Sequence, residues 1–85
     1  MTLRVLYFAW LRERLGKTSE DLTLPPEITT PRAMINWLGG LSPVYVAAFA
    51  DPSLIRCAID QEFCSLDTKL DNAREIAFFP PVTGG

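Results

Sequence analysis

The residues that most clearly could take part in a chemical reaction lie at the end of the sequence, which reads Phe78-Phe79-Pro80-Pro81-Val82-Thr83-Gly84-Gly85. Pro80 and Pro81 cannot pair within a sheet, and they stiffen the backbone that follows a strand. Gly84 and Gly85 carry no Cβ, so they can enter a channel that is too narrow for other residues. The segment therefore predicts an arm that presents the α-carboxylate of Gly85; the alternative is an ordinary frayed terminus.

A carboxylate must be activated before it can react as an electrophile, because it is negatively charged and has no good leaving group. Adenylation by ATP, which gives an acyl-AMP and pyrophosphate, is the usual biological solution. The chain has no Gly-rich phosphate loop and no P-loop lysine, so we expect it to be the substrate of a separate activating enzyme. The activated carbonyl could then accept sulfur to give a thiocarboxylate, or an amine to give an amide.

The composition excludes several other kinds of chemistry. The 85 residues include no histidine, which removes His-based acid–base catalysis, Ser-His and Cys-His dyads, and His-ligated metal sites. Cys57 and Cys64 are too few for a structural zinc site or a disulfide framework. We expect both cysteines to be reduced and buried, and we expect no metal site.

Charge and hydropathy point away from nucleic acids and membranes. The formal net charge is −2, and the eight basic residues are scattered along the chain, whereas nucleic-acid binders usually gather theirs on one face. The apolar run 5–11 is far shorter than the ~20 residues of a membrane span, and no small-residue cleavage site follows it. The sequence predicts a cytoplasmic protein with no nucleic-acid or membrane partner.

Strand and helix signals alternate along one domain. β-branched and aromatic residues or alternating patterns predict strands over 2–9, 19–24, 54–59, 62–65 and 75–79, with the first two paired. A short helix is expected over 10–15. The main helix begins at Pro31 after Thr30 as its cap, places Met34, Ile35 and Leu38 on one apolar stripe and ends at Gly39-Gly40. Another helix begins at Ser42-Pro43 and includes Val44, Val46, Ala47 and Phe49, and a loop covers 66–74.

This order predicts an α+β fold of the β-grasp, ubiquitin-like type, with a mixed sheet packed on one main helix and short extra helices. We assign the β-grasp domain to residues 1–79 and a flexible C-terminal Gly-Gly tail to residues 80–85.

Strand parity predicts an apolar patch on the outer face of this sheet. If Ile76 and Phe78 point into the core, Ala77 and Phe79 must point out. By the same parity Phe8 lies outside, and Phe63 lies at a strand edge. Three phenylalanines on an open face are typical of a protein-binding surface; the alternative is that Phe8 and Phe63 complete the core.

The motifs at both ends resemble one family, the ubiquitin-like small subunits of molybdopterin synthase, which are sulfur carriers. The resemblance begins with Val5-Leu6-Tyr7-Phe8-Ala9, continues through Leu11-Arg12-Glu13 and Gly16, and ends with the segment 75–85. Other sulfur carriers and ubiquitin share Gly-Gly but generally lack the Phe-Pro-Pro-Val sequence that precedes it here.

The resemblance implies a specific role. Gly85 would be adenylated to a transient glycyl-AMP, converted to a 1-thioglycine thiocarboxylate, and would donate sulfur to cyclic pyranopterin monophosphate in molybdenum cofactor biosynthesis. The chain would be the non-catalytic subunit of a sulfurtransferase, with no stably bound cofactor, and ATP and Mg²⁺ would serve the activating enzyme.

The resemblance also implies partners. They are a large synthase subunit in a heterotetramer, an adenylyltransferase similar to the ubiquitin-activating enzymes, and a sulfurtransferase or cysteine desulfurase. The docking face would include Phe8, Phe63 and Phe79, and the tail residues Pro80, Pro81, Val82, Thr83 and Gly84 would enter the partner.

One turn departs from the family pattern, and two other functions share the predicted chemistry. The family usually has Gly-Asp-Glu where this chain has Ala73-Arg74-Glu75. Ala73 adopts a positive φ only at a cost, whereas Asn72 tolerates it better, so we expect the turn to shift by one residue. The alternatives are a protein modifier joined to lysines through Gly85, and a sulfur carrier for thiazole synthesis or tRNA thiolation.

Overall fold

The computed structural model describes residues 2–81. They form five strands, three α-helices and one 3-10 turn, in the order β1 (Thr2–Tyr7), α1 (Trp10–Leu15), β2 (Ser19–Thr23), α2 (Pro31–Gly39), α3 (Pro43–Ala48), η1 (Pro52–Leu54), β3 (Arg56–Ile59), β4 (Glu62–Cys64) and β5 (Glu75–Phe79).

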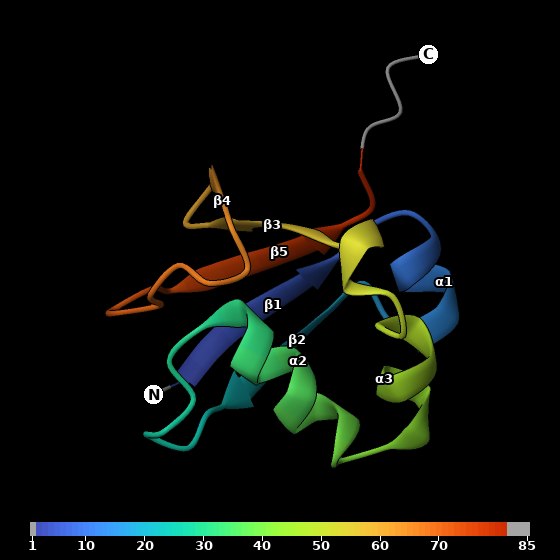
Figure 1. The fold of residues 1–85 in the computed structure, drawn as a ribbon, viewed down its shortest axis with the longest axis horizontal. Coiled ribbons are helices and arrows are strands. Elements are labelled where there is room, and N and C mark those ends of the chain that lie inside the picture. The colour runs from blue at the N-terminus through green and yellow to red at the C-terminus, as the bar shows by residue number, and fades with distance from the viewer. Residues whose placement is uncertain (1, 82–85) are drawn as a thin grey trace.

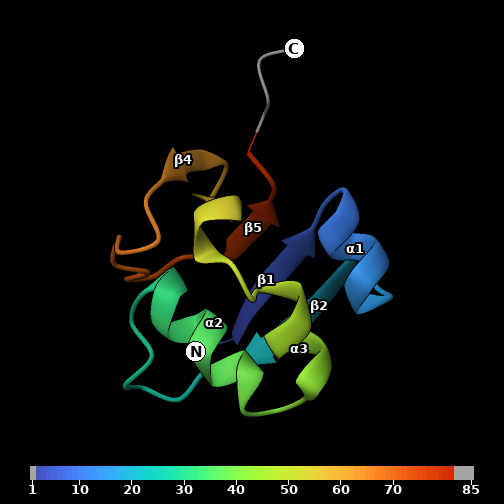
Figure 2. The same ribbon diagram turned by 45° about the vertical axis from the view of Figure 1, so that its right-hand side comes forward.

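The strands form one mixed sheet in the order β2-β1-β5-β3-β4. The first and last strands, β1 and β5, pair in parallel in its centre, and the other neighbouring strands are antiparallel. Helices α2 and α3 lie together on one side of the sheet (Figures 1 and 2). This arrangement confirms the predicted α+β, β-grasp fold and the predicted pairing of the first two strands.

The core lies between the sheet and the helices. Alternate residues of β1 face it, namely Leu3, Val5 and Tyr7, and all three are buried. On the central strand β5, Phe78 is fully buried and packs beside Tyr7 and Phe49, with ring centroids 6.4 and 5.3 Å away. Met34, Ile35 and Leu38 of α2 are also buried, which confirms the predicted apolar stripe.

Local signals fix the ends of the helices. The Thr30 hydroxyl accepts a hydrogen bond from the Ala33 amide at 3.1 Å, and Pro31 occupies the first turn, where its missing N–H costs nothing. Gly16 ends α1 with a φ of 73°, a left-handed conformation that glycine adopts without steric cost. These boundaries agree with the prediction.

Four predicted boundaries are wrong. The first strand ends at Tyr7 rather than at residue 9, because Ala9 has a φ of 55° and cannot continue an extended strand. Leu54 lies in η1 rather than in a strand, since Pro52 begins that turn and Asp51 Oδ1 caps it by accepting from the Ser53 amide at 3.0 Å. The second and fourth strands end one residue early, at Thr23 and Cys64.

Helix α3 forms as predicted, and the residues of this stretch divide between the core and solvent. Tyr45 and Ala48 of α3 and the following Phe49 are buried, whereas Val44 and Val46 are exposed. Phe49 packs against Tyr7 of β1 and Phe78 of β5, whereas the Tyr45 hydroxyl donates to Glu20 of β2.

The turn before β5 shifts further than predicted. The positive φ falls on Asp71, at 47°, and not on Asn72. Ala73 is buried, and its amide donates to the Leu70 carbonyl at 2.9 Å. Asp60 Oδ1 then accepts from the amides of Arg74 and Glu75, both at 3.0 Å, so a carboxylate from the β3–β4 turn orders the start of β5.

A carboxylate on β2 ties the sheet to α3. Glu20 accepts hydrogen bonds from the hydroxyls of Tyr7 and Tyr45 at 2.7 and 2.6 Å and from Lys17 Nζ at 3.1 Å. Burial raises the pKa of Glu20, but the hydrogen bonds from Tyr45, Tyr7 and Lys17 outweigh it and hold the pKa below its usual value. The folded state therefore favours the ionised form of Glu20.

Replacing Phe78 should remove a large part of the folding free energy. We expect Phe78→Ala to lower the free energy of unfolding by about 3–5 kcal/mol, because it leaves a cavity in the centre of the core. Phe63 is 85% exposed, so the matched control Phe63→Ala should change it by less than about 0.5 kcal/mol. Urea denaturation measures both, and equal losses for the two variants would contradict this account of the core.

Replacing Glu20 should have a pH-dependent effect. Because the folded state lowers the pKa of Glu20, its contribution is present above the ordinary value of 4.5 and is lost as the pH falls below it. Glu20→Gln should cost about 1–3 kcal/mol at pH 7, because one amide cannot satisfy three donors. The difference from the natural protein should shrink below pH 4.5.

The neighbouring residue provides the control for this effect. Asp21 forms an exposed ion pair with Arg4, so Asp21→Asn should change stability by less than about 1 kcal/mol. A Glu20→Gln effect that stays constant from pH 7 to pH 3 in urea denaturation would show that the carboxylate charge plays no part.

Candidate functional site

The predicted arm begins at the end of the central strand. Phe79 is the last residue of β5, and half-buried Pro80 and Pro81 follow it outside the sheet. Because β5 lies between β1 and β3, the chain leaves the sheet at the end of its central strand, as Figure 1 shows. Val82, Thr83, Gly84 and Gly85 lie outside the described residues, so their predicted roles stay predictions.

The predicted phenylalanines lie outside the core. Phe63 is 85% exposed, Phe8 is 46% exposed and Phe79 is half-buried. The rings of Phe63 and Phe79 pack together with centroids 5.6 Å apart. This agrees with the parity argument for the three phenylalanines, and the alternative that Phe8 and Phe63 complete the core is wrong. Ala77, for which the same argument predicts an outward position, is only 9% exposed, although it does not belong to the core cluster.

Strand pairing explains how these residues come together. Ala58 is opposite both Phe63 and Ala77 in the register, and its small side chain leaves room for the ring of Phe63 to reach Phe79. On the other side of β5, the Phe8 amide donates to the Phe78 carbonyl at 3.1 Å. We call Phe8, Phe63 and Phe79, together with the buried residues Ala58 and Ala77, the outer patch. It adjoins the start of the arm, and its role in binding stays a prediction.

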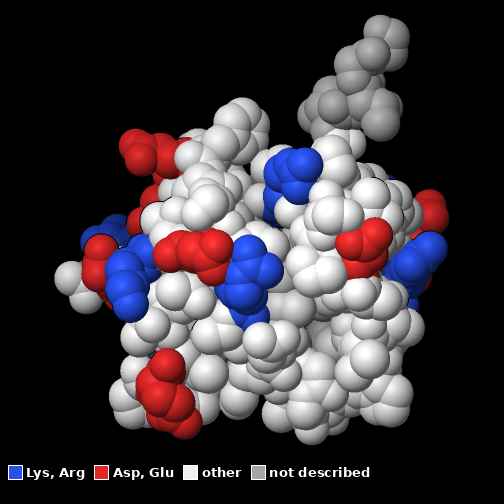
Figure 3. Space-filling view, viewed as in Figure 1, with Lys and Arg blue, Asp and Glu red and all other residues white. Residues whose placement is uncertain are grey.

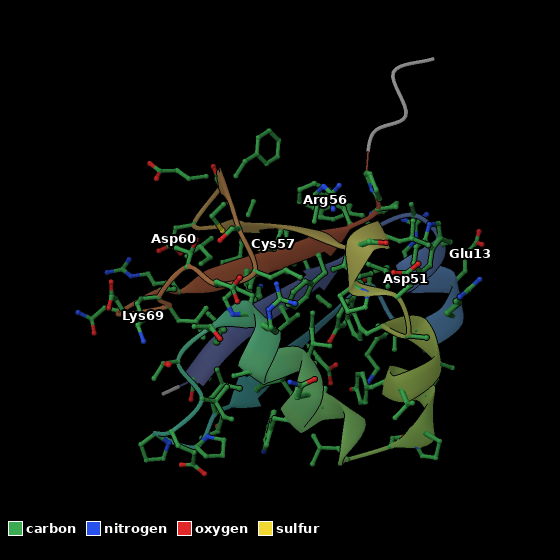
Figure 4. All side chains as sticks on the ribbon, in the orientation of Figure 1. Glu13, Asp51, Arg56, Cys57, Asp60 and Lys69 are labelled. Carbon is green, nitrogen blue, oxygen red and sulfur yellow. The ribbon has the colours of Figure 1, made fainter. Side chains whose placement is uncertain are left out.

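Arg56 also belongs to this region, although the sequence did not single it out. It lies opposite Phe79 in the register of β3 and β5, and Figure 4 shows it beside the end of β5. Its guanidinium donates to the carbonyls of Ser53 and Ile55 at 3.0 and 3.1 Å, which holds a positive charge near the outer patch. Strand alternation could have placed Arg56 outside, but its proximity to Phe79 depends on the pairing of strands distant in sequence.

Other kinds of site find no support in the part of the chain that the structure describes. Residues 2–81 hold no group of three or more potential metal-ligating side chains, and none of their helices is long and apolar enough to span a membrane. Acidic and basic side chains are interspersed on the face shown in Figure 3. Cys57 and Cys64 are unbridged, and Cys57 is buried as predicted, but Cys64 is only partly buried.

The comparisons with known proteins agree on one family. Residues 5–85 match the model of the ThiS family. The chain is 34% identical over 83 residues to the protein named molybdopterin synthase sulfur carrier subunit of Escherichia coli strain K12, and the match covers 98% of this chain and 99% of that protein. The protein of the same name from Haemophilus influenzae is 36% identical, with the same coverage.

A solved structure matches the fold. The small archaeal modifier protein 1 of H. volcanii superposes with a TM-score of 0.70 at 25% identity, covering 95% of this chain and 98% of that one. The similarity therefore extends over the whole β-grasp sheet and its helices.

Proposed function

Since this chain belongs to the ThiS family, we propose that it is the sulfur-carrier subunit of a molybdopterin synthase. The observation that carries the proposal is its 31–36% identity, over almost the whole length, to four proteins with the name molybdopterin synthase sulfur carrier subunit. Pro80 and Pro81 directly follow Phe79, the last residue of β5, and precede Val82-Thr83-Gly84-Gly85. This order of residues supports the proposal.

The first step in the proposed function is activation of Gly85. A carboxylate oxygen attacks the α-phosphorus of ATP, pyrophosphate leaves, and an acyl-adenylate forms. The described residues contain no histidine and no group of three or more potential metal-ligating side chains, so in this proposal a separate adenylyltransferase supplies the catalytic groups and the Mg²⁺. This subunit provides the carboxylate and the surface by which the enzyme recognises it.

The second step installs sulfur. A persulfide sulfur from a sulfurtransferase or cysteine desulfurase attacks the carbonyl carbon, AMP leaves, and reduction of the remaining S–S bond by a thiol releases the thiocarboxylate. The tail then carries this sulfur to cyclic pyranopterin monophosphate in the large subunit. No cofactor stays bound to the carrier.

The outer patch is the proposed docking surface. Phe63 and Phe79 form a contiguous aromatic pair, and exposed aromatic side chains that lie together are typical of protein interfaces. Because the patch adjoins Pro80, a partner that covers it also receives the tail. The large subunit would bind here, with two small and two large subunits in the complete synthase.

A second candidate function is protein modification. It is favoured by the TM-score of 0.70 to the small archaeal modifier protein 1. Activation of Gly85 would be the same, but a lysine amine would attack the adenylate or a thioester derived from it. Gly-Gly adducts on lysines of other proteins, with no thiocarboxylate formed, would favour this function.

Intact mass spectrometry tests the sulfur-carrier proposal. Incubation of the purified chain with a cognate activating enzyme, ATP, cysteine, cysteine desulfurase and a thiol reductant should exchange one oxygen for one sulfur. Fragmentation should place the sulfur on Gly85. The absence of this species, while the same enzymes convert another carrier, would contradict the proposal.

A chain with one alanine added after Gly85 provides the control. It should retain the fold and the binding of the large subunit, because the outer patch is unchanged, yet it should form no molybdopterin. Full activity of the extended chain would overturn the mechanism at the carboxylate of Gly85.

Replacing Phe79 should weaken partner binding. We expect Phe79→Ala to reduce affinity for the large subunit by about 1–3 kcal/mol, because it removes half of the aromatic pair at the centre of the patch. Leu41 is 56% exposed but lies after α2, so Leu41→Ala is the matched control and should bind normally. Calorimetric titration measures both, and equal affinities for the two variants would remove Phe79 from the interface.

A further inference from the structure

The two cysteines face each other across the β3–β4 hairpin. Cys57 and Cys64 are directly opposite in the register, and their Sγ atoms are 3.5 Å apart. Opposite residues of antiparallel strands have Cα atoms about 4.5–5.5 Å apart, which lies within the ~4.4–6.8 Å range of disulfides. A bond of ~2.05 Å therefore requires only side-chain movement and no rearrangement of the strands.

The hairpin leaves one sulfur accessible and keeps the other buried. Cys64 lies on β4, the edge strand of the sheet, and is partly exposed, whereas Cys57 is 1% exposed and belongs to the core cluster. Burial, and to a lesser extent the hydrogen bond with Cys64, raises the pKa of the Cys57 thiol to about 12. An oxidant in solution therefore meets Cys64 first.

We propose that Cys57 and Cys64 form a modification site, a dithiol that low-molecular-weight disulfides oxidise to an intramolecular disulfide. The Cys64 thiolate attacks the reagent disulfide RSSR, forms a mixed disulfide with one RS group and releases the other as RS⁻. The Cys57 thiol then loses its proton and attacks the Cys64 sulfur, and the second RS⁻ leaves with that proton. The protein loses two protons and two electrons, and the reagent is reduced to two RSH molecules.

Proximity favours closure over a persistent mixed disulfide. The Cys57 sulfur is already in contact with its target, and oriented neighbouring groups react as if at very high concentration. This offsets the small thiolate fraction of Cys57. Phe63 lies between the hairpin turn and Cys64, so the disulfide would restrain the strand that presents Phe63 in the outer patch.

The test uses the full chain in glutathione redox buffers of increasing oxidised fraction. Intact mass spectrometry should show loss of two hydrogen atoms, with the intramolecular disulfide exceeding the mixed disulfide by at least about tenfold. Proteolytic cleavage after Glu62 places the two cysteines on different peptides. The proposed disulfide should keep these two peptides joined until a reductant is added.

Two variants provide the controls. Cys57→Ala should retain one glutathione on Cys64, and Cys64→Ala, which leaves the core residue in place, should resist modification. Accumulation of glutathione adducts on the natural chain without closure would overturn the proposal. Loss of hydrogens only in a covalent dimer would also overturn it, since the bond would then join two molecules.

Discussion

The parallel pairing of β1 with β5 is the constraint on which the rest of the structure depends. The register runs from Arg4 opposite Glu75 to Tyr7 opposite Phe78, so the first and last strands occupy the middle of the sheet. Parallel strands require a crossover connection, and residues 8–74 provide it. That connection carries the helices that cover one face, which leaves the other face open. The end of β5 therefore emerges beside an uncovered sheet surface.

Strand alternation divides two neighbouring phenylalanines between stability and recognition. Phe78 is fully buried against Tyr7 and Phe49, whereas Phe79 faces outward and packs on Phe63. A register shift of one residue would exchange these roles. The hydrogen bonds of Tyr7 and Tyr45 with Glu20 fix β1 and α3 relative to β2, and the same Tyr7 forms part of the aromatic core around Phe78. The interactions that hold the sheet in register thus also determine what the outer face displays.

The sequence predicted the elements whose signals are local and missed those that depend on distant contacts. The cap at Thr30, the stop at Gly16 and the parity of β5 are properties of a few adjacent residues, and the structure agrees with each. The positive φ at Asp71 was not predictable, because it depends on burial of Ala73 and on Asp60, which reaches the start of β5 from another hairpin. Arg56 at Phe79 and Cys57 at Cys64 likewise depend on strand register. In the outer patch, the sequence therefore identified the three phenylalanines and Ala77, but it did not identify Ala58 or the nearby Arg56.

The proposed function has a geometric consequence for its partners. Gly85 is six residues beyond Phe79, and six fully extended residues span at most ~20 Å. Any active site that reacts with the carboxylate must therefore lie within about that distance of the end of β5. If the outer patch is the docking surface proposed above, a partner with a catalytic centre so close to the sheet would also cover part of it. The activating enzyme and the large subunit would then compete for one surface, so activation and sulfur delivery would occur in separate complexes. Release from the first partner would be an obligatory step between them.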